Sequence, residues 1–190
     1  GNPVLCDTAT VAIQVFDNTN GTNDPPIANN DAFQIVEGNT LSVSVISNDA
    51  DPDGNNLTIN QVPVTAPENG TVTINNSGVI NYIPNPGFVG VDSFTYVICD
   101  DGIPTLCDTT VVTIEVLPIS PENLPPFTNS DFETTEENTA VNGTLLPNDG
   151  DPNAGDIITV NQTPISGPTN GTVTINTDGT YTYTPDVGFT

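Results

Sequence analysis

The sequence predicts an all-β protein made of tandem β-sandwiches, and three observations lead to that fold class. The chain repeats itself with a period of about one hundred residues. Apolar and polar residues alternate along short segments, as they do in half-buried strands. Segments rich in Pro, Gly, Asn and Asp separate these runs, and no window has a convincing helical period. We therefore expect each repeat to fold as one small sandwich.

The internal repeat is visible as matching motifs. Cys6 to Thr8 returns as Cys107 to Thr109, Pro25-Pro26 as Pro125-Pro126, and Asn69 to Asn75 as Asn170 to Asn176. The offset is 100 residues before an acidic loop and 101 after it, so one residue is inserted in the second copy, near Ala154. A fixed period of this kind is typical of arrays in which each repeat is one structural unit.

Seven short strands are expected in the middle repeat. Leu41, Val43 and Val45 show the pattern, because they alternate with Ser42 and Ser44. Thr and Val, which are common here, suit a pleated sheet. The expected strands lie near Ala32 to Val36, Leu41 to Ile46, Leu57 to Gln61, Gly70 to Asn75, Val79 to Ile83, Asp92 to Cys99 and Leu106 to Val116.

The repeat boundaries divide the chain into five parts. Residues 1–17 are expected to be the last strand of a truncated repeat, 18–24 a linker, 25–117 a complete repeat, 118–124 a second linker, and 125–190 an incomplete repeat without its last two strands. Prolines at or beside the short linkers limit bending, which predicts a rod. A less favoured alternative is that Asn2 to Phe16 is donated to another copy's open sandwich. The strand equivalent to Asp92 to Cys99 would still be absent in that case.

The composition is strongly acidic. The chain has 24 Asp and Glu residues and no Lys, Arg or His, so any counter-charge must come from solution. This favours metal ions or salt. It argues against nucleic acid, whose phosphates would be repelled, and against an anionic membrane surface. No run of 18 apolar residues is present, so no membrane-spanning segment is predicted.

The acidic loop has a cation-binding pattern. Asp49, Asp51 and Asp53 alternate and are followed by Gly54, as in the first half of an EF-hand loop. An EF-hand itself is rejected because strands flank the loop and Asn60 stands at its twelfth position. Oxygen donors without any His favour Ca²⁺ over Zn²⁺. The alternative is that these are ordinary turn residues, since Asp, Asn, Pro and Gly also favour turns.

The cysteines indicate a hairpin crosslink. Cys99 and Cys107 flank a seven-residue connection between two expected strands, so their sulfurs can face each other. A disulfide there fits an extracellular setting, and a pair of buried free thiols is the alternative. Cys6 corresponds to Cys107, and its expected partner would lie just before Gly1. Catalytic thiol chemistry is not expected, because no His is available as a base.

The assembled motifs resemble a known family. They include Asn69 to Val72, Gly87 to Tyr96, and Asp100 to Gly102, in addition to the acidic loop. They are similar to the tandem bacterial immunoglobulin-like or cadherin-like repeats of giant secreted surface adhesins, and in composition to the gliding-motility adhesins of the Bacteroidota. The resemblance implies seven-stranded immunoglobulin-like sandwiches arranged as a rod, an extracellular location at the cell surface, and repeats stiffened by calcium.

Immunoglobulin topology predicts which acids meet. The loop between the second and third strands lies at the same end as the loop between the last two, so Asp100 and Asp101 should lie beside the acidic loop at the junction with the preceding repeat. The candidate Ca²⁺ ligands are Asp49, Asp51, Asp53, Asp100, Asp101, Asp149, Asp151, Asn153 and Asp156. The second set is weaker, because Asn153 replaces an Asp and an insertion precedes Asp156.

Two threonines are candidate modification sites. Asp7-Thr8-Ala9 and Asp108-Thr109-Thr110 resemble the O-glycosylation acceptor of Bacteroidota, which makes Thr8 and Thr109 the candidates. The alternative is that both are ordinary strand residues.

The sequence does not predict an enzyme. It offers only carboxylates, hydroxyls and cysteines, and most acids lie in repeating turns, although a two-carboxylate glycosidase is chemically possible. Three functions remain: a stalk of a surface adhesin, a module that binds glycans or a protein, and a spacer attached to a secreted hydrolase. The aromatic residues fall mostly at inward positions, which favours the stalk. Its partners would be neighbouring repeats of the same long chain, and surface glycans or a cell-surface anchoring machinery are further candidates.

Overall fold

The computed structural model describes residues 5–16, 21–119, 123–153 and 155–190. Parts of the first expected strand and of both linkers, and the inserted Ala154, lie outside these ranges. The described residues contain strands and no helix. The strands are β1 (Val11–Phe16), β2 (Asp31–Val36), β3 (Leu41–Ser44), β4 (Thr58–Ile59), β5 (Gly70–Ile74), β6 (Val79–Pro84), β7 (Gly90–Cys99), β8 (Cys107–Leu117), β9 (Asp131–Glu136), β10 (Val141–Thr144), β11 (Gly171–Ile175) and β12 (Thr180–Pro185).

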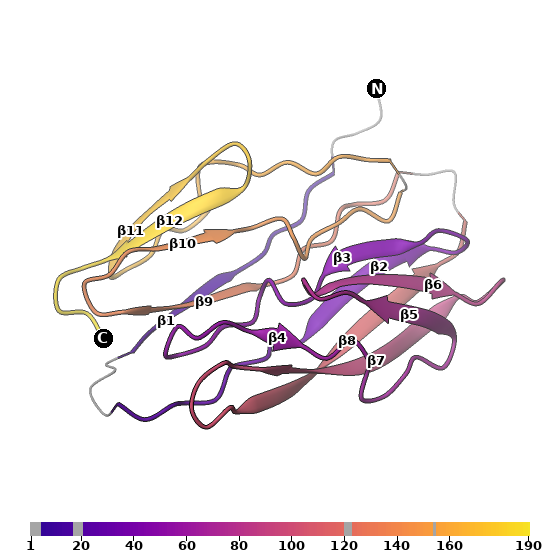
Figure 1. Cartoon of the computed structure of the whole chain (residues 1–190). Coiled ribbons are helices and arrows are strands. Elements are labelled where there is room, and N and C mark those ends of the chain that lie inside the picture. The colour runs from indigo at the N-terminus through magenta and orange to yellow at the C-terminus, as the bar shows by residue number, and fades with distance from the viewer. Residues whose placement is uncertain (1–4, 17–20, 120–122, 154) are drawn as a thin grey trace.

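The middle repeat is the predicted seven-stranded sandwich (Figure 1). One sheet has the order β2-β8-β7-β4 and the other β3-β6-β5. β2 runs parallel to β8, while β7 pairs antiparallel with β8 from Gly90 to Cys99. All strand ends agree with the sequence prediction to within two residues; β4, for example, ends at Ile59, two residues before the expected Gln61. There the Asn60 side chain accepts a hydrogen bond from the Val62 amide and Pro63 follows, so the strand ends early.

The core of this repeat lies between the two sheets and is built from alternate residues. Phe94, Tyr96 and Ile98 of β7 are fully buried, and so are Val112 and Ile114 of β8. Their neighbours in sequence point outward, as the two-residue period requires. Most of the buried core residues are aromatic or β-branched, and such large side chains let a chain with only 35% hydrophobic residues form a core.

The third repeat combines residues from both ends of the chain. Its small sheet has the order β10-β12-β11, and β9 pairs in parallel with β1. Val11 lies opposite Asp131, as Val112 lies opposite Asp31 in the middle repeat. β1 thus occupies the position of a last strand and pairs within the same chain. The sequence had suggested strand donation only between copies.

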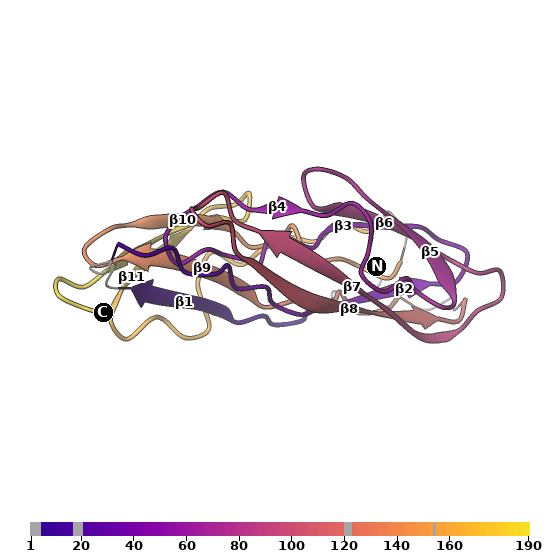
Figure 2. The same cartoon turned by 60° about the horizontal axis from the view of Figure 1, so that its bottom comes forward.

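The two repeats contact each other along their sides, as Figures 1 and 2 show. The Phe33 and Phe127 rings meet edge to face with centroids 6.0 Å apart. The Ala32 amide donates to the Asn129 side chain (2.7 Å), and the Thr134 hydroxyl donates to the Asp51 carbonyl (2.8 Å). The structure does not show the end-to-end rod. No helix in the described part of the chain is long and apolar enough to cross a membrane.

Candidate functional site

The acidic loop between β3 and β4 turns around one carboxylate. Asp51 Oδ1 accepts hydrogen bonds from the amides of Asp53 (2.9 Å) and Asn55 (3.1 Å). Gly54, with φ of +73°, takes the left-handed conformation that closes the turn. Asp53 Oδ2 in turn accepts the Asp24 amide at 2.6 Å, so the incoming linker is attached to the loop.

The loop between β7 and β8 joins the same end of the repeat. Asp100 Oδ1 accepts the amides of Gly102 and Leu106, both at 3.0 Å, while its Oδ2 accepts the Asn23 side-chain amide at 2.9 Å. Asn23 also accepts a hydrogen bond from the Asn55 side chain at 2.7 Å. Asn23 therefore connects the linker to both loops. Burial acts to raise the pKa of Asp100, but these hydrogen bonds to its charged form hold it below the usual value.

Asp51 is the acid of this group whose surroundings disfavour its charged form. Burial raises its pKa, and the charges of Asp100 and Asp53 raise it further despite two amide hydrogen bonds. Its Oδ2 is buried and has no hydrogen-bond partner. An uncompensated carboxylate oxygen beside two more carboxylates is chemically suited to a hard cation. Within the described ranges, no three acidic, Cys or His side chains converge closely enough to hold an ion as they stand.

The other two predicted ligands of the middle repeat lie elsewhere. Asp101 is exposed and accepts hydrogen bonds from the amide and side chain of Asn56, which lower its pKa. Asp49 points into the sandwich, where it accepts the Asn29 amide (2.8 Å) and the Tyr96 hydroxyl (2.9 Å). The structure thus brings Asp51, Asp53 and Asp100 together and directs Asp49 away from them.

Asp49 belongs to a buried polar cluster that the sequence reasoning missed. Asp31 is 1% exposed and lies on the other side of the Tyr96 hydroxyl, 3.3 Å away. Burial, followed by the nearby Asp49 charge, raises the pKa of Asp31 well above its usual value. Burial also raises the pKa of Asp49 to about 7. The available signal was the position of Asp31, which shares the inward register of Phe33 and Ile35.

The acidic loop of the third repeat reproduces part of this arrangement. Asn153 Oδ1 accepts the Leu124 amide at 2.7 Å, as Asp53 accepts Asp24, and the Asn153 amide donates to Asp151 Oδ1 at 2.8 Å. Asp149 accepts the Asn129 amide at 2.8 Å. The Asp156 amide donates to the Asn153 carbonyl, and its charge contributes to a raised pKa of Asp151, in which burial is the larger cause.

The predicted disulfide is confirmed. Cys99 and Cys107 are joined with an S–S distance of 2.06 Å and close the hairpin between β7 and β8. Cys6 is exposed and free. The modification candidates Thr8 and Thr109 are both exposed, and in each case the threonine amide donates to the preceding aspartate.

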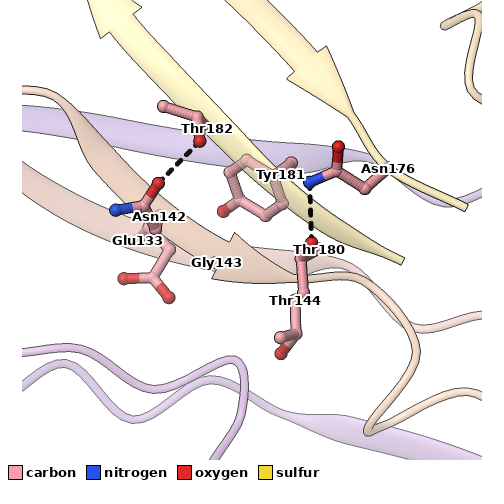
Figure 3. A pocket seen from close by; sticks show the side chains of 8 residues that line it. All are labelled: Glu133, Asn142, Gly143, Thr144, Asn176, Thr180, Tyr181 and Thr182. Carbon is pink, nitrogen blue, oxygen red and sulfur yellow. Dashed lines mark hydrogen bonds between the residues drawn. The ribbon is translucent and has the colours of Figure 1, made fainter. Parts of the chain in front are cut away.

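A pocket of ≈ 480 Å³ lies in the third repeat (Figure 3). It is lined by Glu133, Asn142, Gly143, Thr144, Asn176, Thr180, Tyr181 and Thr182. Burial raises the pKa of Glu133 to about 7. Glu133 is the only acid among these lining residues, so this pocket lacks the pair of carboxylates that glycoside hydrolysis requires.

Comparison with solved structures returns parts of larger hydrolase-related chains. A nucleoside hydrolase-related hypothetical protein from Saccharophagus degradans, associated with carbohydrate metabolism, has 24% sequence identity and a TM-score of 0.38, over 52% of this chain and 27% of that one. The endo-fucoidan hydrolase MfFcnA4 from glycoside hydrolase family 107 has 19% identity and a TM-score of 0.38, over 93% of this chain and 26% of that one. The chain thus spans about a quarter of each.

The search of curated proteins found no match to the chain. The comparison with protein families did find one. The family model described as bacterial Ig domain matches it twice, over residues 23–115 and 123–190. These ranges are the middle and third repeats, and together they include both acidic loops. The chain therefore belongs to the bacterial Ig domain family.

Proposed function

We propose that this chain is a structural part of a bacterial cell-surface protein, in which its sandwiches act as stalk repeats of an adhesin or surface filament and not as an enzyme. The supporting observation is the attachment of the linker before the middle repeat. Asn23 and Asp24 make hydrogen bonds to both loops at the end of the sandwich. A junction fixed on two loops limits the angle between successive repeats, which is what a stalk under load needs.

The location at the cell surface is the part of this proposal that family membership supports, because bacterial Ig domains are commonly found outside the cell or on its surface. It is tested by raising antibodies against the 190-residue chain and labelling intact cells of the source bacterium. Protease treatment of intact cells should remove the signal, while a cytoplasmic control protein stays intact. A signal that appears only after lysis contradicts the proposal.

We further propose Ca²⁺ as the ion that stiffens this junction. Asp51 supports this, because its buried Oδ2 has no partner and the charges of Asp53 and Asp100 face it. An ion would need Asp53 and Asp100 to turn from their present amide partners toward Asp51. The protein would then supply several carboxylate oxygens, and backbone carbonyls or water would complete the shell.

The test is calorimetric titration of Ca²⁺ into the metal-free chain. Asp51→Asn should weaken Ca²⁺ binding at the acidic loop of the middle repeat, which we expect to be the tighter of the two sites, by about tenfold or more, because it removes a charged oxygen donor. Glu68→Gln is the matched control: Glu68 is exposed, and its amide contacts Asp92 near the other end of β7. Equal affinity in both variants, or no heat at millimolar Ca²⁺, removes calcium from the proposal and leaves the structural role standing.

A further inference from the structure

The outer face of β7 and β8 in the middle repeat carries mainly Val and Thr. Its residues are the outward positions that alternate with the buried core positions of the two strands. Across the strands they pair as Thr95 with Val111 and as Val97 with Thr109. Among the outward residues of these two strands, Glu115 is the only acid, although the chain has 24. It lies near one end of the pair, so the centre of the face is uncharged.

A bulged segment beside β7 extends this face. The Val64 amide donates to the Thr95 carbonyl (2.8 Å), and the Thr95 amide donates to the Thr65 carbonyl (3.2 Å), so two residues lie opposite one. The Thr65 and Thr95 hydroxyls are 2.7 Å apart, which shows that this segment reaches the outer side of the sheet. Val64 is 58% exposed. The Val/Thr face is defined as Val64, Thr95, Val97, Thr109, Val111 and Thr113.

This face can lose its water at low cost. The Thr95 hydroxyl oxygen accepts the Thr65 amide at 3.0 Å and contacts the Thr65 hydroxyl, so it has partners within the sheet when water leaves. Val and Thr have few rotamers to lose on burial. The disulfide joins Cys99 to Cys107, which are outward positions of the same two strands at the end of the face. A surface already held in place loses less conformational entropy when it binds.

The charge pattern indicates which partner fits the Val/Thr face. A partner surface that carries acids would bury them against a chain with no basic residue, which is costly. A basic partner would be attracted to the acidic loop, where Asp51, Asp53 and Asp100 gather, and not to an uncharged face. A second copy of the chain presents the same uncharged face. In a two-fold arrangement the face meets itself, so no acid has to lose its water at its centre.

We propose that the Val/Thr face is a self-association surface, on which the same face of a second copy of the chain packs sheet against sheet. The two sheets would lie about 10 Å apart, as the two sheets of a sandwich do. The net charge of −24 on each copy opposes their approach, so the dimer is weak and forms when salt screens the acids. This inference goes beyond the proposed stalk role, because it joins neighbouring stalks side by side.

Sedimentation equilibrium of the whole unmodified chain, in EGTA so that Ca²⁺ cannot bridge acids, measures the association. The affinity should rise several-fold between about 0.05 M and about 0.5 M NaCl. Val111→Asp should weaken the dimer by about tenfold or more, because it places a carboxylate inside a dry face. Val64→Asp, which lies outside the named strands, should do the same without disturbing a strand. Val187→Asp is the matched control: it adds the same charge at a 95% exposed valine of the third repeat and should leave the affinity unchanged.

A charge-swap experiment tests that the face meets itself. A mixture of Val111→Asp and Val111→Lys chains should form a mixed dimer more tightly than either variant pairs alone, because opposite charges then face each other. A native chain that stays monomeric at millimolar concentration in about 0.5 M NaCl, or an equal loss in Val111→Asp and Val187→Asp, overturns the proposal. So does a monomeric chain that instead binds phosphatidylcholine vesicles through this face. None of these results affects the stalk role, which rests on Asn23 and Asp24.

Discussion

At the scale of single residues, the buried carboxylates are the unusual feature of this protein. The chain has no basic side chain with which they could pair, so their partners are amides, amide side chains and tyrosine hydroxyls. Tyr96 is the central donor: it is fully buried and contacts Asp31, Asp49 and the Val45 carbonyl. A buried acid without a countercharge stays in place only if such donors hold it or if it keeps a proton.

Tyr96→Phe is expected to destabilise the chain by about 2 kcal/mol or more, because it removes a hydroxyl that lies within hydrogen-bond distance of both carboxylates. Urea unfolding at pH 7 measures the loss. Tyr181→Phe is the matched control: the Tyr181 hydroxyl is buried without a partner, so its removal should be neutral or slightly stabilising. Equal losses in the two variants would show that the contacts of the Tyr96 hydroxyl with Asp31 and Asp49 do not carry the effect.

The pH dependence of stability follows from the same acids. Burial raises the pKa of Asp49 and of Glu133 to about 7, that of Asp131 to about 8, and that of Asp149 to about 6. Between pH 4 and 8 the native state therefore binds more protons than the unfolded chain. Stability should fall as the pH rises through this window, by about 1.4 kcal/mol per pH unit for each extra proton, and level off above pH 8.

The lower limit of that window comes from other acids. Hydrogen bonds lower the pKa of Asp101 and of Asp178, so both lose stabilising interactions below about pH 4. Unfolding experiments across the range should find a maximum near pH 4 to 5. Asp31→Asn should flatten the slope above the maximum, because it removes one raised acid from the pair with Asp49. A stability that rises steadily from pH 5 to 8 contradicts this account.

At the scale of elements, the strands of the middle repeat could be predicted because their side chains follow a strict two-residue period. The acidic loop could be predicted as a motif, but not the direction of each side chain, because a turn has no such period. Asp49 therefore points to Tyr96 and not to Asp51. The pairing of β1 with β9 within the chain was not predicted, because partner choice between distant strands depends on which edges are open.

Removal of the hairpin disulfide is the prediction for an element. Cys99 and Cys107 are eight positions apart, and closing so short a loop in the unfolded chain is worth about 2–3 kcal/mol. A Cys99→Ser, Cys107→Ser double variant should lose about that much in urea unfolding, and reductant should lower the native chain to the same level. Cys6→Ser, the control, removes the free thiol and should change neither value. A native chain indifferent to reductant would contradict the prediction.

At the scale of the whole molecule, the net charge of −24 sets the balance between two kinds of stabilisation by ions. All charged side chains have the same sign. Folding and the side-by-side packing of the repeats bring these charges closer together, so their mutual repulsion opposes both. General screening relieves this repulsion with any salt, because the Debye length falls from about 30 Å at 0.01 M to about 8 Å at 0.15 M. A specific site responds only to its own ion, and by mass action.

These two contributions can be separated by urea unfolding in NaCl and CaCl₂ at matched ionic strength. The midpoint should rise with NaCl over 0.01 to 0.15 M, because screening favours the compact state of a chain with charges of one sign. CaCl₂ should give a further rise in the native chain, and Asp51→Asn should keep the NaCl effect while losing the extra gain. If both salts act equally on both proteins, the stabilisation is screening alone. If NaCl lowers the midpoint, repulsion among the acids does not limit stability, and the hydrogen bonds that hold each carboxylate already offset it.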